Sequence, residues 1–65
     1  MKNYYAFSIK KTLKESKEGQ NKSLRFKSGD EVFAMKICKN NFGENKFQLY
    51  SFENFNDINT FKKII

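Results

Sequence analysis

Basic side chains and aromatic rings are the residues of this sequence whose types could act on another molecule. Eight of the basic residues fall within residues 1–27, beside only Glu15 and Glu18, so this part carries all of the net charge of +6. Grooves that bind nucleic acid combine lysines and arginines, which neutralise phosphates, with rings on which bases stack. The residues predicted to contact a protein partner or nucleic acid are Lys10, Lys11, Lys14, Lys17, Lys22, Arg25, Lys27, Tyr4, Tyr50 and Phe42.

The same lysines have a second explanation. The sequence is rich in Lys, Asn, Ile and Phe and contains no Pro, Trp or His. This is the residue usage of an AT-rich genome, in which lysine is the ordinary surface residue. Net charge bears on association and solubility and not on the fold. The stretch from residue 9 to residue 27 is therefore either a contact surface for a polyanion or the hydrated side of a small sheet.

The sequence contains few residues that could catalyse a reaction or bind a metal ion. The sequence has no histidine, hence no imidazole base, and its single cysteine, Cys38, lacks the further thiols or imidazoles of a zinc site. Its three glycines are isolated and form no phosphate-binding loop. Asp30 and Glu31 are adjacent carboxylates that a solvated turn explains, and Cys38 beside Val32 and Ala34 is predicted to be a small core residue. We therefore expect no enzyme, no metal and no cofactor.

The elements that must position these side chains follow from the alternation of apolar and polar residues. A period of two, typical of half-buried strands, occurs in the segments 5–13, 23–27 and 47–52. Turn-forming residues separate them at Gly19-Gln20-Asn21, at 28–30 and at 40–45. The segment 31–39 has apolar residues on both faces of an extended chain, so it is predicted to be the most central strand.

The last eleven residues change period. Phe55, Ile58, Phe61 and Ile65 lie three or four apart, which is the spacing of one stripe of a helix. The predicted fold is therefore α+β, a curved four-stranded antiparallel meander with one C-terminal helix packed on one face, in the order β-β-β-β-α. The alternative makes residues 60–65 a fifth strand.

Length and composition set the remaining expectations. Residues 1–65 make a single small domain whose core yields about 3–5 kcal/mol, and one cysteine allows no disulfide within the chain. No run of apolar residues reaches the roughly 18 that a membrane span needs. One cysteine and no signal-like segment predict a reducing, cytoplasmic setting.

Three functions fit these features. The first is a small basic protein that occupies a surface of a larger protein or nucleoprotein complex, such as a phage- or mobile-element-encoded inhibitor of a host or defence machine, in the manner of anti-CRISPR proteins. The alternative is direct binding of DNA or RNA, single-stranded or non-specific, through the basic surface of residues 10–27. The third is a subunit that pairs with a second copy of itself as a homodimer. No membrane partner is expected.

Overall fold

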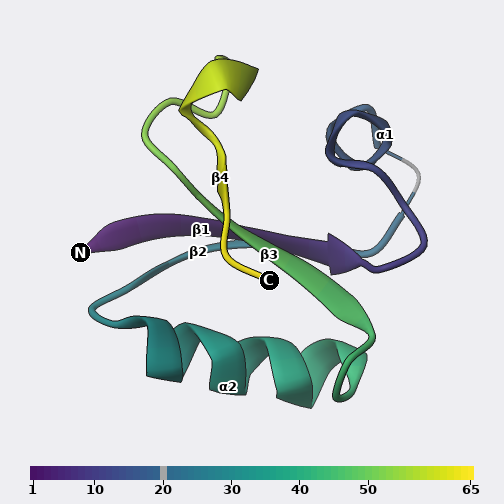
Figure 1. Ribbon diagram of the computed structural model, residues 1–65, viewed down its shortest axis with the longest axis vertical. Coiled ribbons are helices and arrows are strands. Elements are labelled where there is room, and N and C mark those ends of the chain that lie inside the picture. The colour runs from purple at the N-terminus through teal and green to yellow at the C-terminus, as the bar shows by residue number, and fades with distance from the viewer. Residues whose placement is uncertain (20) are drawn as a thin grey trace.

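Over the residues that the structure describes, four strands, two α-helices and one 3₁₀ helix make up the fold. The computed structural model describes residues 1–19 and 21–65, and Gln20 of the predicted turn lies outside them. The elements are β1 (Lys2–Ser8), α1 (Leu13–Lys17), β2 (Ser23–Ser28), α2 (Glu31–Phe42), β3 (Phe47–Phe52), the 3₁₀ helix η1 (Ile58–Thr60) and β4 (Lys62–Lys63). The strands form one antiparallel sheet in the order β2-β1-β3-β4, with α2 on one face and α1 and η1 on the other (Figure 1). The predicted α+β class with a four-stranded antiparallel sheet is confirmed.

The prediction of a strand at residues 31–39 is wrong, because this segment forms α2. Asp30 caps the helix, and its carboxylate accepts a hydrogen bond from the backbone N–H of Phe33 at 2.7 Å. Ala34 and Cys38, four residues apart on one side of the helix, are fully buried against the sheet. Residues on the opposite side of the helix are exposed. The apolar residues at successive positions therefore belong to a helix that has an exposed hydrophobic side as well as a buried one.

The prediction of a helix at residues 55–65 is also wrong. The hydroxyl of Thr60 donates to the backbone carbonyls of Asn54 and Asp57, at 2.9 and 2.8 Å, and these bonds close a loop around one 3₁₀ turn. The chain then extends, and Lys62 and Lys63 pair with β3, which is closer to the alternative of a last strand. Of the apolar residues at this spacing, Phe55 and Phe61 pack on the sheet, whereas Ile58 and Ile65 are about half exposed.

The sheet has two different faces because neighbouring residues on a strand point to opposite sides. The face under α2 holds Tyr4, Ala6, Phe47 and Leu49, which pack against Ala34 and Cys38. The other face holds Tyr5, Phe7, Tyr50 and Phe52, covered by Leu13, Phe55 and Phe61. The first strand is shorter than predicted, since it ends at Ser8 and Leu13 begins α1. Within residues 1–19 and 21–65, no helix is long and apolar enough to cross a membrane.

Candidate functional site

One face of the sheet carries six rings in mutual contact, and we call this set the aromatic face. It comprises Tyr5, Phe7, Tyr50, Phe52, Phe55 and Phe61. Phe61 stacks on Phe52 with ring centroids 4.9 Å apart, and Phe55 meets Tyr5 edge-on at 5.3 Å. Such offset or edge-to-face pairs stabilise beyond the area that they bury. The rings come from β1, β3 and the segment after β3, so they join parts of the chain that are far apart in sequence.

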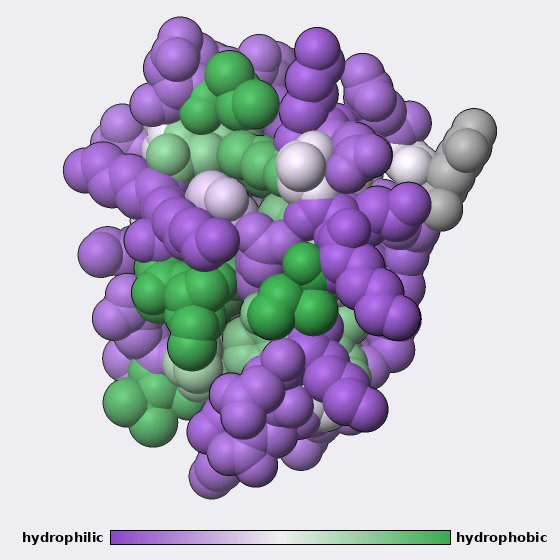
Figure 2. All heavy atoms as spheres, turned by 45° about the vertical axis from the view of Figure 1, so that its right-hand side comes forward, coloured by the Kyte–Doolittle hydropathy of each residue, from purple (hydrophilic) through white to green (hydrophobic). Residues whose placement is uncertain are grey.

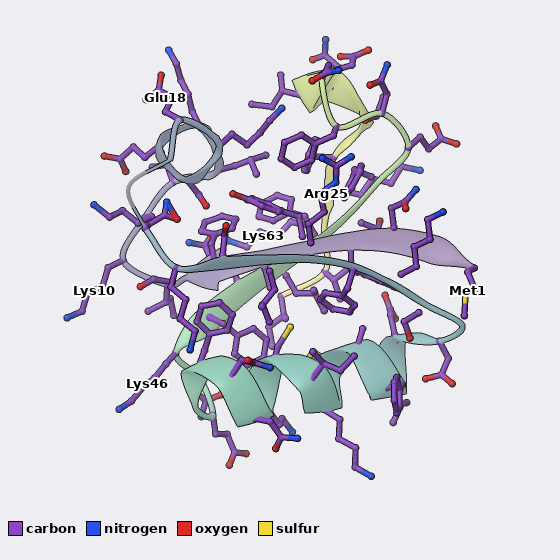
Figure 3. All side chains as sticks on the ribbon, turned by 180° about the vertical axis from the view of Figure 1, so that it is seen from behind. Met1, Lys10, Glu18, Arg25, Lys46 and Lys63 are labelled. Atoms are coloured by element: carbon purple, nitrogen blue, oxygen red, sulfur yellow. The ribbon has the colours of Figure 1, made fainter. Side chains whose placement is uncertain are left out.

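Two of the predicted contact cations cover the aromatic face. The Lys17 ammonium lies 4.9 and 4.7 Å from the centroids of Phe55 and Phe61, and it donates to the backbone carbonyl of Phe55 at 2.5 Å. The Arg25 guanidinium lies 4.1 Å from the Phe55 centroid, and Figure 3 shows it directed from β2 toward the rings. A cation over a ring contributes about 0.5–2 kcal/mol, depending on its exposure. Lys17 and Arg25 therefore help to hold the fold together.

The short helix α1 is fixed by local hydrogen bonds. Thr12 and Glu15 form a reciprocal capping box, in which Glu15 accepts from the Thr12 backbone N–H at 3.0 Å. The hydrogen bonds from Thr12 lower the pKa of Glu15, and the nearby charge of Lys11 adds to that effect. The buried Ser16 hydroxyl shares a hydrogen bond with the Tyr5 hydroxyl at 2.7 Å. Lys14 stays exposed on this helix, while the Lys11 charge is offset by Glu15.

Three lysines from separate segments meet at one end of the molecule. Strand β1 ends there and strands β2 and β3 begin there, because Phe7 pairs with Ser23 and Ser8 pairs with Phe47. Helix α2 also ends at this place, just before β3. An open pocket at this end is lined by Ser8, Ile9, Lys10, Lys22, Phe42 and Lys46. We call it the lysine pocket.

The lysine pocket combines cations with apolar surface. The Lys22 ammonium lies 5.1 Å from the Phe42 ring centroid and donates to the backbone carbonyl of Asn41. Lys10 and Lys46 point into solvent from the same end of the sheet, opposite the end that holds Met1 (Figure 3). Ile9 between them is 55% exposed. The site thus offers positive charge around an exposed aliphatic side chain and a ring, which suits a negatively charged partner with apolar parts.

A second pocket adjoins the lysine pocket across Ile9. Its apolar wall includes Met35, Phe47 and Ile65, and Lys39 and Lys63 contribute positive charge. Figure 2, which turns this end of the molecule forward, shows hydrophobic side chains in green set among hydrophilic ones in purple. The two pockets share Ile9, and both have lysines in their lining.

The opposite end of the molecule differs in charge. Asp30 and Glu31 lie at the start of α2, just after β2 ends. Glu53 follows the end of β3, where Phe52 pairs with Asn3 near the N-terminus. Lys2 and Lys62 line a pocket with Glu53, so cations and carboxylates are mixed there. The lysine-pocket end also carries carboxylates, since Glu18 lies on that side of the molecule (Figure 3) and Glu44 falls between α2 and β3, but among the described residues the pocket itself is lined by three lysines and no carboxylate.

The predicted contact residues are only partly brought together. Lys10, Lys22 and Phe42 share the lysine pocket, whereas Lys27 is exposed on β2 away from it. Tyr4 is a correction: its side chain is 1% exposed and lies in the core under α2, so it has no surface to offer a partner. Tyr50 is half-buried, stacks on Phe7 with centroids 5.7 Å apart, and belongs to the aromatic face.

Three members of the lysine pocket, Ser8, Ile9 and Lys46, were not among the predicted contact residues, and Lys46 is the charged one. It lies outside the basic stretch, directly before the alternating segment that became β3. Its backbone carbonyl accepts a hydrogen bond from Ile9 at 3.2 Å, which places it beside Lys10. The pairing of the first predicted strand with the third would have been needed to find it.

Cys38 and the carboxylates form no recognisable reactive centre in the part of the chain that the structure describes. Cys38 is fully buried between α2 and the sheet, and burial raises the pKa of its thiol to about 11. The thiolate, which is the nucleophile, is therefore scarce at neutral pH. Residues 1–19 and 21–65 contain no group of three or more His, Cys, Asp or Glu side chains placed to hold a metal ion.

Comparison with protein-family models, with curated proteins and with solved structures gives no match for this chain. The function must therefore be argued from the surfaces described above.

Proposed function

We propose that this chain is a non-enzymatic binding protein that occupies an acidic surface of a larger protein or nucleoprotein complex. The observation that carries the proposal is the convergence of Lys10, Lys22 and Lys46 around Ile9 and Phe42 at one end of the molecule. Charged residues around an apolar centre are the usual composition of an interface, in which the apolar part excludes water and the charged rim gives specificity. The positive field would raise the rate of association with an acidic partner.

Occupation of such a surface would block the partner's own ligand, so we further propose that the protein is an inhibitor. Its small size, its basic charge and its AT-rich residue usage fit a protein of a phage or mobile element that acts in the cytoplasm on a host or defence machine. An anti-CRISPR-like role belongs to this class. The scarcity of reactive groups, with a buried and protonated Cys38 thiol, favours inhibition by occupancy over inhibition by catalysis.

Two triple variants of equal charge test the binding surface. Lys10, Lys22 and Lys46 are replaced by Gln in the first variant, and Lys2, Lys36 and Lys62, which are exposed elsewhere, are replaced by Gln in the control. Each tagged protein is used to capture partners from a nuclease-treated lysate of the cells that encode the chain. We expect wild type and control to retain the same stoichiometric protein, and the lysine-pocket variant to lose it.

Retention of that protein by both variants would place the interface elsewhere. Capture of no stoichiometric protein by the wild-type chain would contradict the proposal as a whole. Circular dichroism of both variants checks that they fold, since the six lysines concerned are all exposed side chains.

A second candidate function is direct binding of a nucleic acid, and the Phe42 ring favours it. This ring is partly exposed in the same pocket as three lysines, which is the combination that single-strand-binding grooves use. Contacts with phosphates release counterions, so affinity would fall steeply as the salt concentration rises. Fluorescence polarisation with single-stranded DNA, duplex DNA and RNA at low salt measures this directly.

Phe42→Leu separates stacking from charge in that experiment. Leucine keeps the apolar packing but removes the ring, so the affinity for a single strand would fall by about tenfold while the salt dependence stayed the same. If the wild-type chain binds none of the oligonucleotides below about 100 μM, which is weaker than ordinary non-specific binding, this second function is excluded.

A further inference from the structure

Strand β2 is an edge strand of the sheet and has a neighbouring strand on one side only. The strand order β2-β1-β3-β4 leaves the outer side of β2 without a partner strand among the residues that the structure describes. Figure 3 looks onto this side of the molecule, and β2 runs across the front of the sheet there. A strand of six residues with one bare edge presents unpaired backbone groups to any extended chain.

The backbone groups that face outward can be derived from the pairing. The Ile9 N–H bonds to the Lys46 carbonyl, so the odd-numbered residues of β1 direct their backbone groups toward β3. Even-numbered residues of β1 therefore face β2, where Tyr4 is opposite Phe26 and Ala6 is opposite Leu24. It follows that Ser23, Arg25 and Lys27 direct their N–H and C=O groups to the open edge.

The side chains along β2 alternate in chemistry. Arg25 and Lys27 are exposed on the side of the aromatic face, whereas Leu24 and Phe26 are half-buried on the side of α2. Phe33 and Met35 lie on opposite flanks of α2. Met35 lines a pocket with β3 residues, so the flank that carries Phe33 is the one beside Leu24 and Phe26 of β2. Phe33 is 57% exposed, so apolar surface is available next to the edge.

We propose that the open edge of β2 accepts an extended segment of a partner protein as a fifth strand. Residues of that segment opposite Arg25 and Lys27 would be acidic, and those opposite Leu24 and Phe26 would be apolar. Main-chain hydrogen bonds to Ser23, Arg25 and Lys27 would supply affinity, and the alternating side chains would supply specificity. This edge adjoins the lysine pocket at Lys22, the residue before β2, but the proposal does not depend on what the lysine pocket binds.

Charge decides between an acidic peptide and a second copy of this chain. If two β2 strands paired with each other, basic side chains of both copies would share one face of the joined sheet around Arg25 and Lys27. Like charges in facing positions destabilise a strand pair, and lysine on an edge strand is a recognised defence against self-pairing. An acidic segment turns the same charges into favourable cross-strand pairs.

Synthetic peptides test the strand addition with the full chain. The probes are eight-residue blocked peptides with alternating Glu and Val, with alternating Lys and Val, and with the same Glu and Val residues in two blocks. We expect the alternating Glu-Val peptide to bind at least about tenfold more tightly than either of the others. At about 90% saturation it would slow amide exchange at Ser23, Arg25 and Lys27 about tenfold, since each amide is then exposed a tenth of the time.

Lys27→Pro separates strand addition from simple attraction of charges. Proline is tolerated on an edge strand where the N–H faces outward, so the pairing of β2 with β1 would be kept while one outward donor is lost. We expect a loss of affinity about tenfold larger than that of Lys27→Ala, which removes the charge alone. Equal losses, equal binding of the block peptide, or unchanged exchange at the three amides would each overturn the proposal. Sedimentation that revealed a dimer through β2 would overturn it in favour of self-pairing.

Discussion

One face of the sheet is covered by helix α2. The aromatic face is covered by α1 and by the segment that follows β3, which are distant in the sequence. Helix α2 contributes small side chains, Ala34 and Cys38, which are fully buried against the larger side chains of the sheet, Tyr4, Phe47 and Leu49. On the aromatic face the contacts are made by rings, and Lys17 and Arg25 lie over them as cations. The comparison shows that positive charge helps to close the fold over the aromatic face, whereas meeting a partner is the role that we propose for the lysine pocket.

The aromatic face should be the more sensitive to truncation. Phe61 stacks on Phe52 and receives the Lys17 ammonium 4.7 Å from its centroid, so it joins β3, α1 and the last segment. We expect Phe61→Ala to destabilise the protein by about 3 kcal/mol, which is close to the whole stability of a domain of this size. Urea unfolding followed by near-ultraviolet circular dichroism measures this.

Phe61→Leu is the matched control because it keeps most of the volume and removes the ring. It should cost about half as much or less as Phe61→Ala. A loss below about 1 kcal/mol for Phe61→Ala would mean that the aromatic face does not hold the fold together.

The burial of Cys38 between α2 and the sheet can be tested through the pH dependence of the free energy of unfolding. Burial raises the pKa of the Cys38 thiol to about 11, from 9.0 in the unfolded chain. The folded state therefore holds the proton more strongly, and its contribution to stability is full below pH 9 and lost as the pH rises toward 11. The free energy of unfolding should fall by roughly 1.4 kcal/mol per pH unit in this window.

Cys38→Ala isolates the contribution of the thiol from the contributions of all other groups. The slope between pH 9 and pH 11 should be shallower in this variant by the amount that the thiol contributes. Identical slopes in the variant and the wild-type chain would show that the thiol is hydrated in the folded state. Slow reaction of Cys38 with a thiol reagent under native conditions is the companion measurement.

The cations of the aromatic face should matter for stability. Arg25→Gln and Lys17→Gln should each cost about 1 kcal/mol, because each removes a cation from the rings. Both cations touch Phe55, so the double variant should show a coupling between the two losses. Losses that add without coupling would mean that the two cations act independently.

The cations of the lysine pocket should matter least for stability. Lys10→Gln and Lys46→Gln should change the free energy of unfolding by less than about 0.5 kcal/mol, since both side chains are exposed and point into solvent. Urea unfolding of these variants beside Arg25→Gln makes the comparison directly. If Lys10→Gln or Lys46→Gln lowered the free energy of unfolding more than Arg25→Gln does, the lysine pocket and not the aromatic face would be where the cations stabilise the fold.

Alternation placed the strands at 23–27 and 47–52 correctly. In β2 it reflects one exposed face, whereas β3 is packed on both faces, with Phe47 and Leu49 under α2 and Tyr50 and Phe52 on the aromatic face. Alternation failed at 31–39, where apolar residues at successive positions fit both a doubly covered strand and a helix with exposed Phe33 and Val32. The N-cap at Asp30 and the spacing of Ala34 and Cys38 were the signals for a helix.

The surfaces were harder to predict than the strands. Lysines at similar spacing have unlike roles, because Lys17 is drawn over Phe61 by a loop from the far end of the chain while Lys10 remains in solvent. Lys46 joins Lys10 only through the pairing of β1 with β3. Contacts between distant segments leave no local pattern, so the division of the basic residues into two groups needed the three-dimensional structure.

The most direct test of this division is the salt concentration at which two variants elute from a column of a sulfated polyanion. Both triple variants, at Lys10, Lys22 and Lys46 and at Lys2, Lys36 and Lys62, lose the same charge. If positive charge is focused at the lysine pocket, its variant elutes at clearly lower salt than the control. Elution of both variants at the same salt would contradict the account, because the charge would then act as a diffuse property of the whole surface.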